Sequence, residues 1–255
     1  LFALSLRLKP GVPADHLTEF EAAAKAAGRP LEEGLFANTV YDLSSGMGCS
    51  TVVVEKGRSD TGSPLFGRNF DWLPTKGITE HTLVAVFKPT GKRAFAVVTV
   101  SPIAGCISGM NDAGLAVSLN EIVLKYSGDK ARFNWDGTPT MLAFRRVLEE
   151  CKTVAEAEAL LRGLKRTTAA SLTACDKAGG AVFEMTPKSF VVRSPDHGVT
   201  CCTNHFVSDP LTVNRPCKRL PRLLELQQSD AKLGVDDVFA RLGEVHQGSK
   251  TLQSM

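Results

Sequence analysis

The chain has 255 residues, of which 43% are apolar and 22% are charged, and its net charge at pH 7 is +3. This composition is typical of a globular protein, and one domain with a sizeable core is expected at this length. The net charge is small and the charged residues are evenly scattered along the chain, so they do not indicate nucleic acid or an anionic membrane as a partner. The sequence has no apolar run of about 18 residues and predicts no transmembrane helix.

The cysteines and the start of the chain do not define a cellular compartment. Seven cysteines, an odd number at irregular spacing, argue against a disulfide framework. The chain opens on Leu1 rather than on methionine, and residues 1–8 are too few for the apolar part of a signal peptide. The sequence therefore does not decide whether a secretion signal preceded Leu1. A homo-oligomer stays open too, because nothing in the sequence reports on self-association.

Residues 1–48 are expected to form a pro-segment or a peripheral N-terminal layer. A helical spacing of apolar residues begins after Pro13, with Asp15 as a candidate N-cap, and ends at Gly28. The stretch 31–41 is polar and contains glycine, so we interpret it as a connection to the glycine-rich approach to Cys49. This segment has little core character.

Residues 49–255 are expected to form the main domain, which begins with short strands. Runs of β-branched and aromatic residues alternate with Gly, Pro, Asn or Asp. The predicted strands are 51–55, 64–70, 82–88, 93–100 and 114–120. Residues 88–92 and 109–114 are interpreted as turns. Such short connections indicate antiparallel neighbours.

Helices and strands alternate in blocks through the second half. Helices are predicted at 138–152 and 153–164, the latter opened by a capping box of Thr153 and Glu156. The remaining predictions are strands at 171–176, 181–186, 189–194 and 200–206, and helices at 220–229 and 235–242. This order predicts an α+β fold of antiparallel sheets packed together with helices outside. Residues 251–255 read as the start of a strand, which suggests truncation at the C-terminus.

Cys49 is the candidate nucleophile. It follows Gly46-Met47-Gly48, whose glycines leave the backbone open to attack, and it precedes an apolar strand. A cysteine attacks as thiolate, so it needs a nearby cation or base. Of the five histidines, only His205 lies in a motif-like setting. A cut between Gly48 and Cys49 would supply another base, an α-amine with a pKa of about 7.7–8.0.

Four motifs in order resemble one family of enzymes. They are Gly48-Cys49-Ser50-Thr51, Gly67-Arg68-Asn69-Phe70-Asp71, Leu119-Asn120 and Thr203-Asn204-His205-Phe206. Together they resemble N-terminal-nucleophile hydrolases of the acyl-coenzyme A:6-aminopenicillanic-acid acyltransferase-like branch, which is related to choloylglycine hydrolase and penicillin V acylase. The resemblance implies a four-layer αββα sandwich over residues 49–255.

The resemblance also implies a role for each matching residue. Cys49 would be the nucleophile and would cut the Gly48–Cys49 bond to free its own amine. Arg68 would favour the thiolate, and Asp71 would orient the amine. Asn204 and Asn120 would donate to the oxyanion. A later arginine completes such sites, and Arg219 is preferred here over Arg215 and Arg222.

The implied activity is that of a cysteine-dependent amidohydrolase or acyltransferase. It would act on a linear amide through a thioester, with a small amide or acyl donor as substrate and without a cofactor. One spacing departs from this expectation: Arg68 and Asp71 are three residues apart, so a regular strand would point them to opposite faces. They would share a site only if the strand bends or ends near Asn69.

Two alternatives remain open at this stage. A metal-assisted hydrolase could use Cys201, Cys202, His205 and Cys217, although adjacent cysteines in a strand point to opposite faces and zinc sites usually show paired spacing. The other alternative is a non-catalytic binding relative that kept the fold. An uncut chain has no free amine and should be inactive by the mechanism above.

Overall fold

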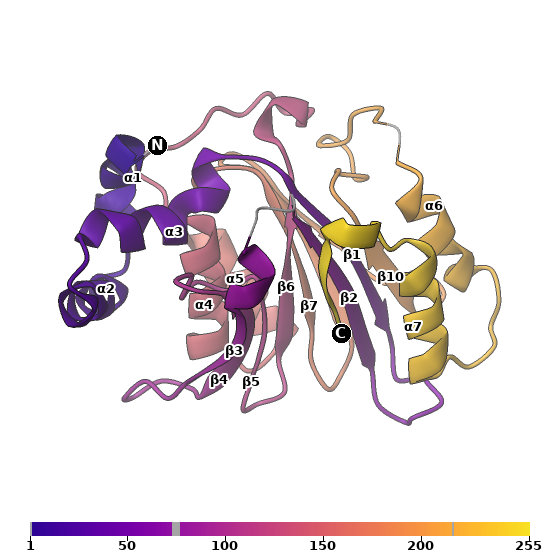
Figure 1. The fold of residues 1–255 in the computed structure, drawn as a ribbon. Coiled ribbons are helices and arrows are strands. Elements are labelled where there is room, and N and C mark those ends of the chain that lie inside the picture. Colours follow the sequence, from indigo (N-terminus) through magenta and orange to yellow (C-terminus); the bar gives the residue numbers. More distant parts are fainter. Residues whose placement is uncertain (1, 73–76, 216) are drawn as a thin grey trace.

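Two antiparallel sheets form the centre of the protein in a computed structural model that describes residues 2–72, 77–215 and 217–255 (Figure 1). The smaller sheet has the strand order β10-β1-β2-β11 and the larger has the order β3-β4-β5-β6-β7-β8-β9. The strands are β1 Met47–Val54, β2 Leu65–Trp72, β3 Thr82–Phe87, β4 Phe95–Val100, β5 Ser108–Asn111, β6 Ala116–Glu121, β7 Ala170–Cys175, β8 Gly180–Met185, β9 Phe190–Arg193, β10 Val199–Cys202 and β11 Thr251–Ser254.

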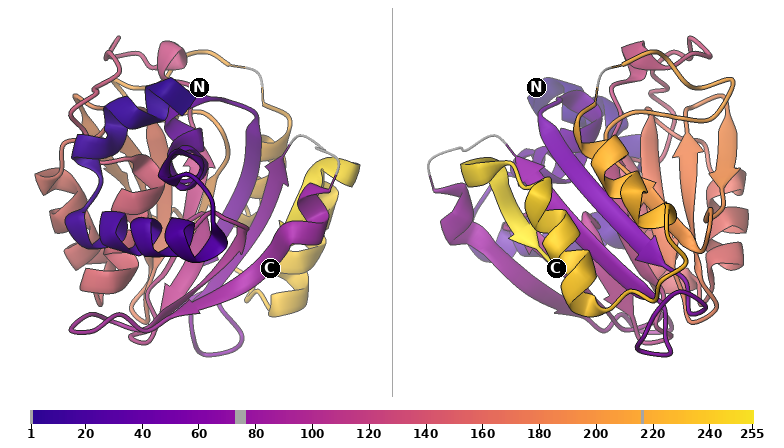
Figure 2. Two further views of the ribbon diagram at one scale, coloured as in Figure 1. Left: turned by 60° about the vertical axis from the view of Figure 1, so that its left-hand side comes forward. Right: turned by 90° about the vertical axis from the view of Figure 1, so that its right-hand side faces the viewer.

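Helices cover the outer face of each sheet. The helices α6 (Arg219–Leu224) and α7 (Val235–Glu244) pack on β1, β2 and β10, whereas α4 (Thr140–Glu150) and α5 (Val154–Gly163) pack on β5 to β8. The α+β prediction with four αββα layers is therefore confirmed. Three further helices, α1 (Phe2–Leu8), α2 (Ala14–Ala27) and α3 (Leu31–Leu43), lie together at one end of the molecule (Figure 2). No helix within the described ranges is both long and apolar enough to cross a membrane.

The strand β1 is buried on both faces, which explains its unbroken apolar run. Cys49 belongs to the core between the two sheets, whereas Val52 and Val54 pack against Leu223 and Val238 of the covering helices. Antiparallel neighbours on both sides, β10 and β2, hold its backbone. The cysteine therefore lies in a rigid central element.

The N-terminal segment is more helical than the sequence indicated. Residues 31–43 form the helix α3 rather than a polar connection. Glu32 and Glu33 lie in its first turn, where carboxylates favour the helix dipole. The polar residue Asn38 does not face water but accepts the backbone N–H of Ala104 and Gly105, both at 2.8 Å. A polar sequence thus packs inward because its side chains satisfy buried backbone groups.

A cluster of ion pairs, buried at Glu149 and exposed at Asp15, joins the helix α2 to the helix α4 and to Lys92. His16 Nε2 lies 2.9 Å from Glu149 Oε2, and Lys92 Nζ binds Asp15 at 2.5 Å and Glu149 at 2.6 Å. Burial alone would raise the pKa of Glu149, but His16, Lys92 and Arg145 lower it to about 2. Asp15 is therefore an ion-pair partner, and the prediction that it caps the helix is wrong: no side chain caps the start of α2.

Several boundaries also differ from the predictions. Ser108–Asn111 is the strand β5, not a turn, and β1 begins at Met47 rather than at residue 51. The strand β10 ends at Cys202, so 203–206 is not a strand. Half of the predicted capping box of α5 is confirmed: Thr153 Oγ1 accepts the N–H of Glu156 at 3.2 Å, but the Glu156 carboxylate accepts the N–H of Lys152 rather than that of Thr153. Residues 251–254 form the strand β11, as their composition indicated.

Candidate active site

Cys49 lies where β1 pairs with β2, and the register decides which groups surround it. Cys49 pairs with Phe70, Gly48 with Asp71 and Thr51 with Arg68. Because side chains alternate along a strand, Arg68 points to the same face of the sheet as the Cys49 thiol, and Asp71 points to the opposite face. The strand β2 continues in register through Trp72, so it neither bends nor ends near Asn69, which was the condition set for a shared site.

The thiol of Cys49 is buried beside a buried arginine. Arg68 Nη2 donates to Cys49 Sγ at 3.2 Å, and Arg68 Nη1 donates to Ile107 O at 2.6 Å. The thiol itself donates to Leu119 O at 3.3 Å. Burial raises the pKa of Cys49, although the Arg68 charge opposes that effect. In the uncut chain, therefore, the thiol is held in place in its protonated form.

The backbone of Cys49 is held by two residues from the C-terminal part of the chain. Cys49 N–H donates to Asn204 Oδ1 at 2.8 Å. Arg219 Nη2 donates to the same oxygen at 2.7 Å, and its Nη1 donates to Cys49 O and, at 3.0 Å, to Ser50 Oγ. The preference for Arg219 agrees with this geometry. Arg222, by contrast, pairs with Glu225 and Glu244 on the surface.

Asp71 flanks Gly48 from the face opposite the thiol. Its Oδ1 accepts from Thr251 Oγ1 at 2.6 Å, and its Oδ2 lies 3.6 Å from Arg219 Nη1. Oδ2 is buried and accepts no hydrogen bond from the described residues. A Cβ at position 48 would lie 3.0 Å from this oxygen, so glycine there permits a close approach. Arg68 and Asp71 thus share one site from opposite sides of the strand.

Asn120 lies one step further from the cysteine. Its Oδ1 accepts from Thr51 Oγ1 at 3.0 Å, and its Nδ2 donates to Cys202 O at 3.3 Å. Its side chain makes no hydrogen bond to Cys49 within the described chain, whereas Asn204 does. The structure therefore brings Arg68, Asp71, Asn204 and Arg219 next to Cys49 and Gly48. Asn120, the sixth predicted residue, contacts Thr51 and Cys202 instead.

Glu121 also belongs to the candidate site, although none of the four sequence motifs includes it. This carboxylate accepts the N–H of Gly46 at 3.1 Å and of Met47 at 2.7 Å, and so holds the two residues that precede Gly48. Burial raises the pKa of Glu121, although the two N–H groups counteract it. The only sequence signal was its place directly after Asn120, which by itself fits an ordinary strand end.

The four residues of the metal alternative do not form one cluster: His205 and Cys217 lie together around Thr203, but the two cysteines of β10 point to different partners. Cys201 Sγ contacts Leu223 O on the helix side of β10, whereas Cys202 Sγ contacts Thr203 O. Among the described residues, the one group with metal-ligand spacing is Asp15, His16 and Glu149, and Lys92 Nζ binds both of its carboxylates. The structure thus offers no ligand set built from Cys201, Cys202, His205 and Cys217.

Cys217 is expected to be the fastest-reacting thiol of the uncut chain. Burial alone would raise its pKa, but hydrogen bonds with His205, the Leu220 N–H and Thr203 lower it to about 6. Thiolate should therefore predominate above pH 6 and decline below it, whereas Cys49 stays protonated at neutral pH. Peptide mapping of the chain labelled before self-cleavage, with brief iodoacetamide treatment at pH 7, should find Cys217 labelled first.

The matched control for this labelling is the Cys217→Ser variant, in which the fast phase should disappear. Equal labelling of all seven cysteines, or faster labelling of Cys49, would contradict the assignment. The result also bears on any test of the nucleophile, because rapid alkylation of one thiol does not by itself identify the catalytic one.

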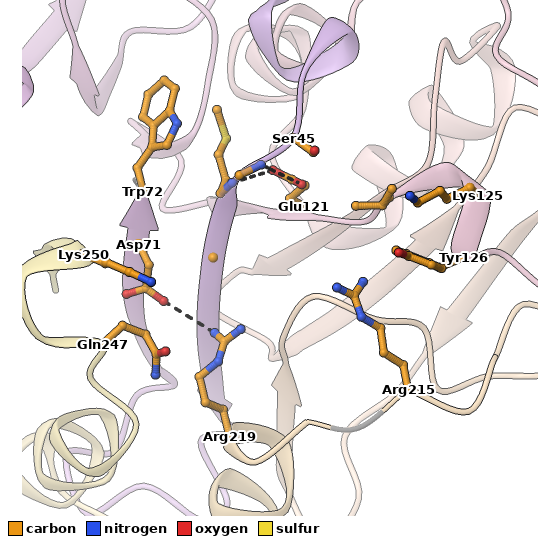
Figure 3. Close-up of a pocket in the computed structure, with 14 residues that line it drawn as sticks. Ser45, Asp71, Trp72, Glu121, Lys125, Tyr126, Arg215, Arg219, Gln247 and Lys250 are labelled. Atoms are coloured by element: carbon orange, nitrogen blue, oxygen red, sulfur yellow. Dashed lines mark hydrogen bonds and ion pairs between the residues drawn. The ribbon is translucent and has the colours of Figure 1, made fainter. Parts of the chain in front are cut away.

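A pocket of about 410 Å³ opens beside the Gly48–Cys49 bond (Figure 3). Residues 45–48 line one wall, and Asp71, Glu121 and Arg219 contribute charged groups. On one side lie Lys125, Tyr126 and Arg215, and on the other Gln247 and Lys250. The bond is thus accessible from the face that carries Asp71 and Arg219, while the thiol points away into the core.

Two stacked antiparallel sheets between helices, with a cysteine on a central strand and polar groups around its backbone, define the N-terminal-nucleophile hydrolase class. The family model described as "Acyl-coenzyme A:6-aminopenicillanic acid acyl-transferase" matches residues 57–246. The chain belongs to this family and is an amidohydrolase or acyltransferase of the N-terminal-nucleophile type. The match includes Arg68, Asp71, Asn120, Asn204 and Arg219 and begins after Cys49.

Solved structures share the fold at low sequence identity. A Caenorhabditis elegans N-acylethanolamine-hydrolyzing acid amidase ortholog superposes with a TM-score of 0.60 and 18% identity, over 80% of this chain and 89% of that one. A mutant of conjugated bile acid hydrolase from Clostridium perfringens gives a TM-score of 0.53 and 16% identity, over 77% of this chain and 78% of that one. No curated protein sequence matches the chain.

Proposed function

We propose that Cys49 is the nucleophile of a cysteine-dependent amidohydrolase or acyltransferase, and that the chain becomes active by cutting its own Gly48–Cys49 bond. The observation that carries this proposal is the set of contacts on one residue. Arg68 donates to its sulfur, Asn204 accepts its N–H, and Arg219 donates to its carbonyl oxygen. Side chains far apart in the sequence therefore converge on the thiol and both backbone groups of Cys49.

The cut would supply the base that the uncut site lacks. A free α-amine at Cys49 titrates near pKa 7.7–8.0 and can accept the thiol proton at neutral pH. Asn204 Oδ1 already lies 2.8 Å from the nitrogen that would become this amine. Asp71 Oδ2, buried and free of hydrogen bonds from the described residues, would accept from it on the other side of the strand. Arg68 would then stabilise the thiolate.

The tetrahedral intermediate requires hydrogen-bond donors at its oxyanion. Asn204 Nδ2 now donates to Glu121 O at 3.0 Å, and Asn120 Nδ2 donates to Cys202 O at 3.3 Å. Each amide nitrogen carries a second hydrogen that it can offer to the oxyanion. Such donors are worth about 3 kcal/mol each in the transition state. We assign this role to Asn204 first, because it contacts Cys49 directly.

The substrate in this proposal is a linear amide. Cys49 Sγ attacks the carbonyl carbon, the amine leaves with a proton, and the acyl group remains as a thioester. Water then releases the acid, or a second amine takes the acyl group. The names of the two structural neighbours, an N-acylethanolamine-hydrolyzing amidase and a conjugated bile acid hydrolase, agree with amide cleavage.

A covalent adduct tests this mechanism directly. Purified protein should consist of two fragments, the larger starting at Cys49. Brief incubation with an activated amide such as an acyl-p-nitroanilide should add the mass of one acyl group to that larger fragment, and hydroxylamine should remove it, as expected for a thioester. A single uncut chain after long incubation would remove the amine base from the mechanism. It would leave the alternative of a non-catalytic binding relative.

A further inference from the structure

The strand β3 forms one edge of the larger sheet, and β4 is its one strand neighbour among the described residues (Figure 1). The pairing with β4 is regular over all six residues of β3. Its sequence, Thr-Leu-Val-Ala-Val-Phe, contains no charge, no proline and no glycine. Natural edge strands commonly carry a charge, a proline or a bulge, because an unprotected edge pairs with other chains. The strand β3 has none of these protections.

The strand β3 is also the longest edge of the two sheets. The other edges, β9, β10 and β11, have four residues each. All four residues of β10 are buried, and β9 carries Arg193, which pairs with Glu184. The edge most open to another strand is therefore β3.

The backbone of β3 presents hydrogen-bonding groups on its outer side. His81 O accepts the N–H of Ser101, so residue 81 and every second residue after it turn their backbone groups toward β4. The backbone groups of Val84 and Val86 consequently point away from the sheet. No hydrogen bond from the described residues reaches them there.

Exposed apolar side chains accompany this open edge. Val84 and Val86 are each 64% exposed. The strand pairings place them on the face of the sheet that carries Ser118, whose Oγ lies 3.3 Å from Thr51 Oγ1 of β1. This is the face turned toward the smaller sheet, and the exposure of the two valines shows that the cover ends before β3. An apolar strip thus lies beside the unpaired backbone.

A second copy of β3 is complementary to this edge when the two strands are antiparallel about a two-fold axis at Val84. Val84 then pairs with its own counterpart and Val86 with Thr82, so outward backbone groups meet outward groups. Four hydrogen bonds would join the strands, because the Thr82 N–H already binds Thr79 O within its own chain. A shift by one residue would oppose Val84 to Ala85, whose backbone groups turn toward β4.

The charges at the two ends of β3 also favour this arrangement. Glu80 precedes the strand and Lys88 follows it; both are exposed, and neither forms an ion pair within the described chain. Antiparallel pairing about Val84 brings Glu80 of each copy to the end where Lys88 of the other lies. Parallel pairing would place the two Lys88 side chains together, and like charges repel there.

We propose that two copies of this chain bind each other through β3, antiparallel and centred on Val84, so that their seven-stranded sheets join into one continuous sheet. This interface does not depend on the proposed role of Cys49, and it lies outside the four sequence motifs. The β-branched side chains of Val84 and Val86 from both copies would meet across the axis, the kind of cross-strand contact that stabilises sheets.

Sedimentation equilibrium of the Cys49→Ala chain tests this interface, since that variant stays one chain whether or not the proposed cleavage occurs. A dimer of two 27.3 kDa chains is expected at a chain concentration of about 100 µM. Val84→Lys, added to this chain, should raise the dissociation constant at least about tenfold, because it places two like charges on the axis. Val235→Lys, at an exposed valine in the first turn of α7, is the matched control and should dimerise like the parent.

A disulfide cross-link tests the register independently. Opposed residues of a hydrogen-bonded antiparallel pair have Cα atoms about 5.5 Å apart, which a disulfide can span. Val84→Cys, in a chain that also carries Cys49→Ala and Cys217→Ser, should therefore form a covalent dimer under mild oxidation with copper phenanthroline. Met110→Cys is the control, because it is 56% exposed on the same face but lies five strand spacings, about 24 Å, from its counterpart.

Three results would overturn the proposal. The first is a monomer at every concentration up to about 100 µM. The second is a dimer whose dissociation constant Val84→Lys leaves unchanged while circular dichroism shows an intact fold. The third is a covalent dimer that forms as readily through Met110→Cys as through Val84→Cys. None of these results would bear on the proposed catalysis, which is tested by the acyl adduct.

Discussion

The Cys49→Ala variant is expected to remain one uncut chain and to lose amide turnover completely. The substitution removes the sulfur that would attack both the Gly48 carbonyl and the substrate. It leaves the backbone contacts to Asn204 and Arg219 in place, because these use the N–H and C=O of residue 49. Folding should therefore persist, with a modest cost for the atom lost from the core.

Intact mass spectrometry of the purified variant beside the wild type measures this result, with circular dichroism to check the fold. Cys106→Ala is the matched control, because Cys106 is equally buried in the same core. That control should still be cut and should still turn over amides. Two fragments from Cys49→Ala, or turnover within tenfold of wild type, would show that another group performs the attack.

The Arg68→Met variant is expected to slow self-cleavage and turnover by between about tenfold and a thousandfold. A cation beside an acidic group commonly lowers its pKa by about 1–3 units, and each lost unit reduces the thiolate fraction tenfold at fixed pH. Methionine keeps an unbranched apolar stem in the core. It also removes the charge-assisted hydrogen bond to Ile107 O, a kind of bond that contributes about 1.5–3 kcal/mol to the free energy of unfolding. That oxygen still accepts the N–H of Leu119 at 2.8 Å.

Two measurements separate the electrostatic effect of Arg68→Met from its cost in stability. The rate of cleavage is followed by mass, and the free energy of unfolding by urea titration. Arg145→Met is the control, since Arg145 is as deeply buried but pairs with Glu19 and Glu149, outside the site. It should lose stability and keep the wild-type cleavage rate once folded. Wild-type rates in Arg68→Met would remove Arg68 from the mechanism.

Local sequence patterns were sufficient for most elements of the fold. Alternating and β-branched runs marked the strands of both sheets, and Thr153 marked the start of α5 with a cap that the structure confirms. The patterns failed where long-range contacts decide the local structure. The helix α3 was predicted as a polar connection, but its Asn38 is buried and accepts the backbone N–H groups of Ala104 and Gly105. The strand β5 was predicted as a turn from its glycine, but its pairing with β4 and β6 keeps it extended.

The sequence by itself determined most of the strands and helices, because these depend on residue type and local periodicity, and its four motifs carried the resemblance that implied the class of enzyme and the residues to test. Only the tertiary structure decided how the site is assembled. The pairing of β1 with β2 places Arg68 and Asp71 on opposite faces of one strand, where Arg68 contacts the Cys49 sulfur and Asp71 lies against Gly48. Glu121 and Arg219 join them through contacts between distant segments, and no local pattern encodes such contacts.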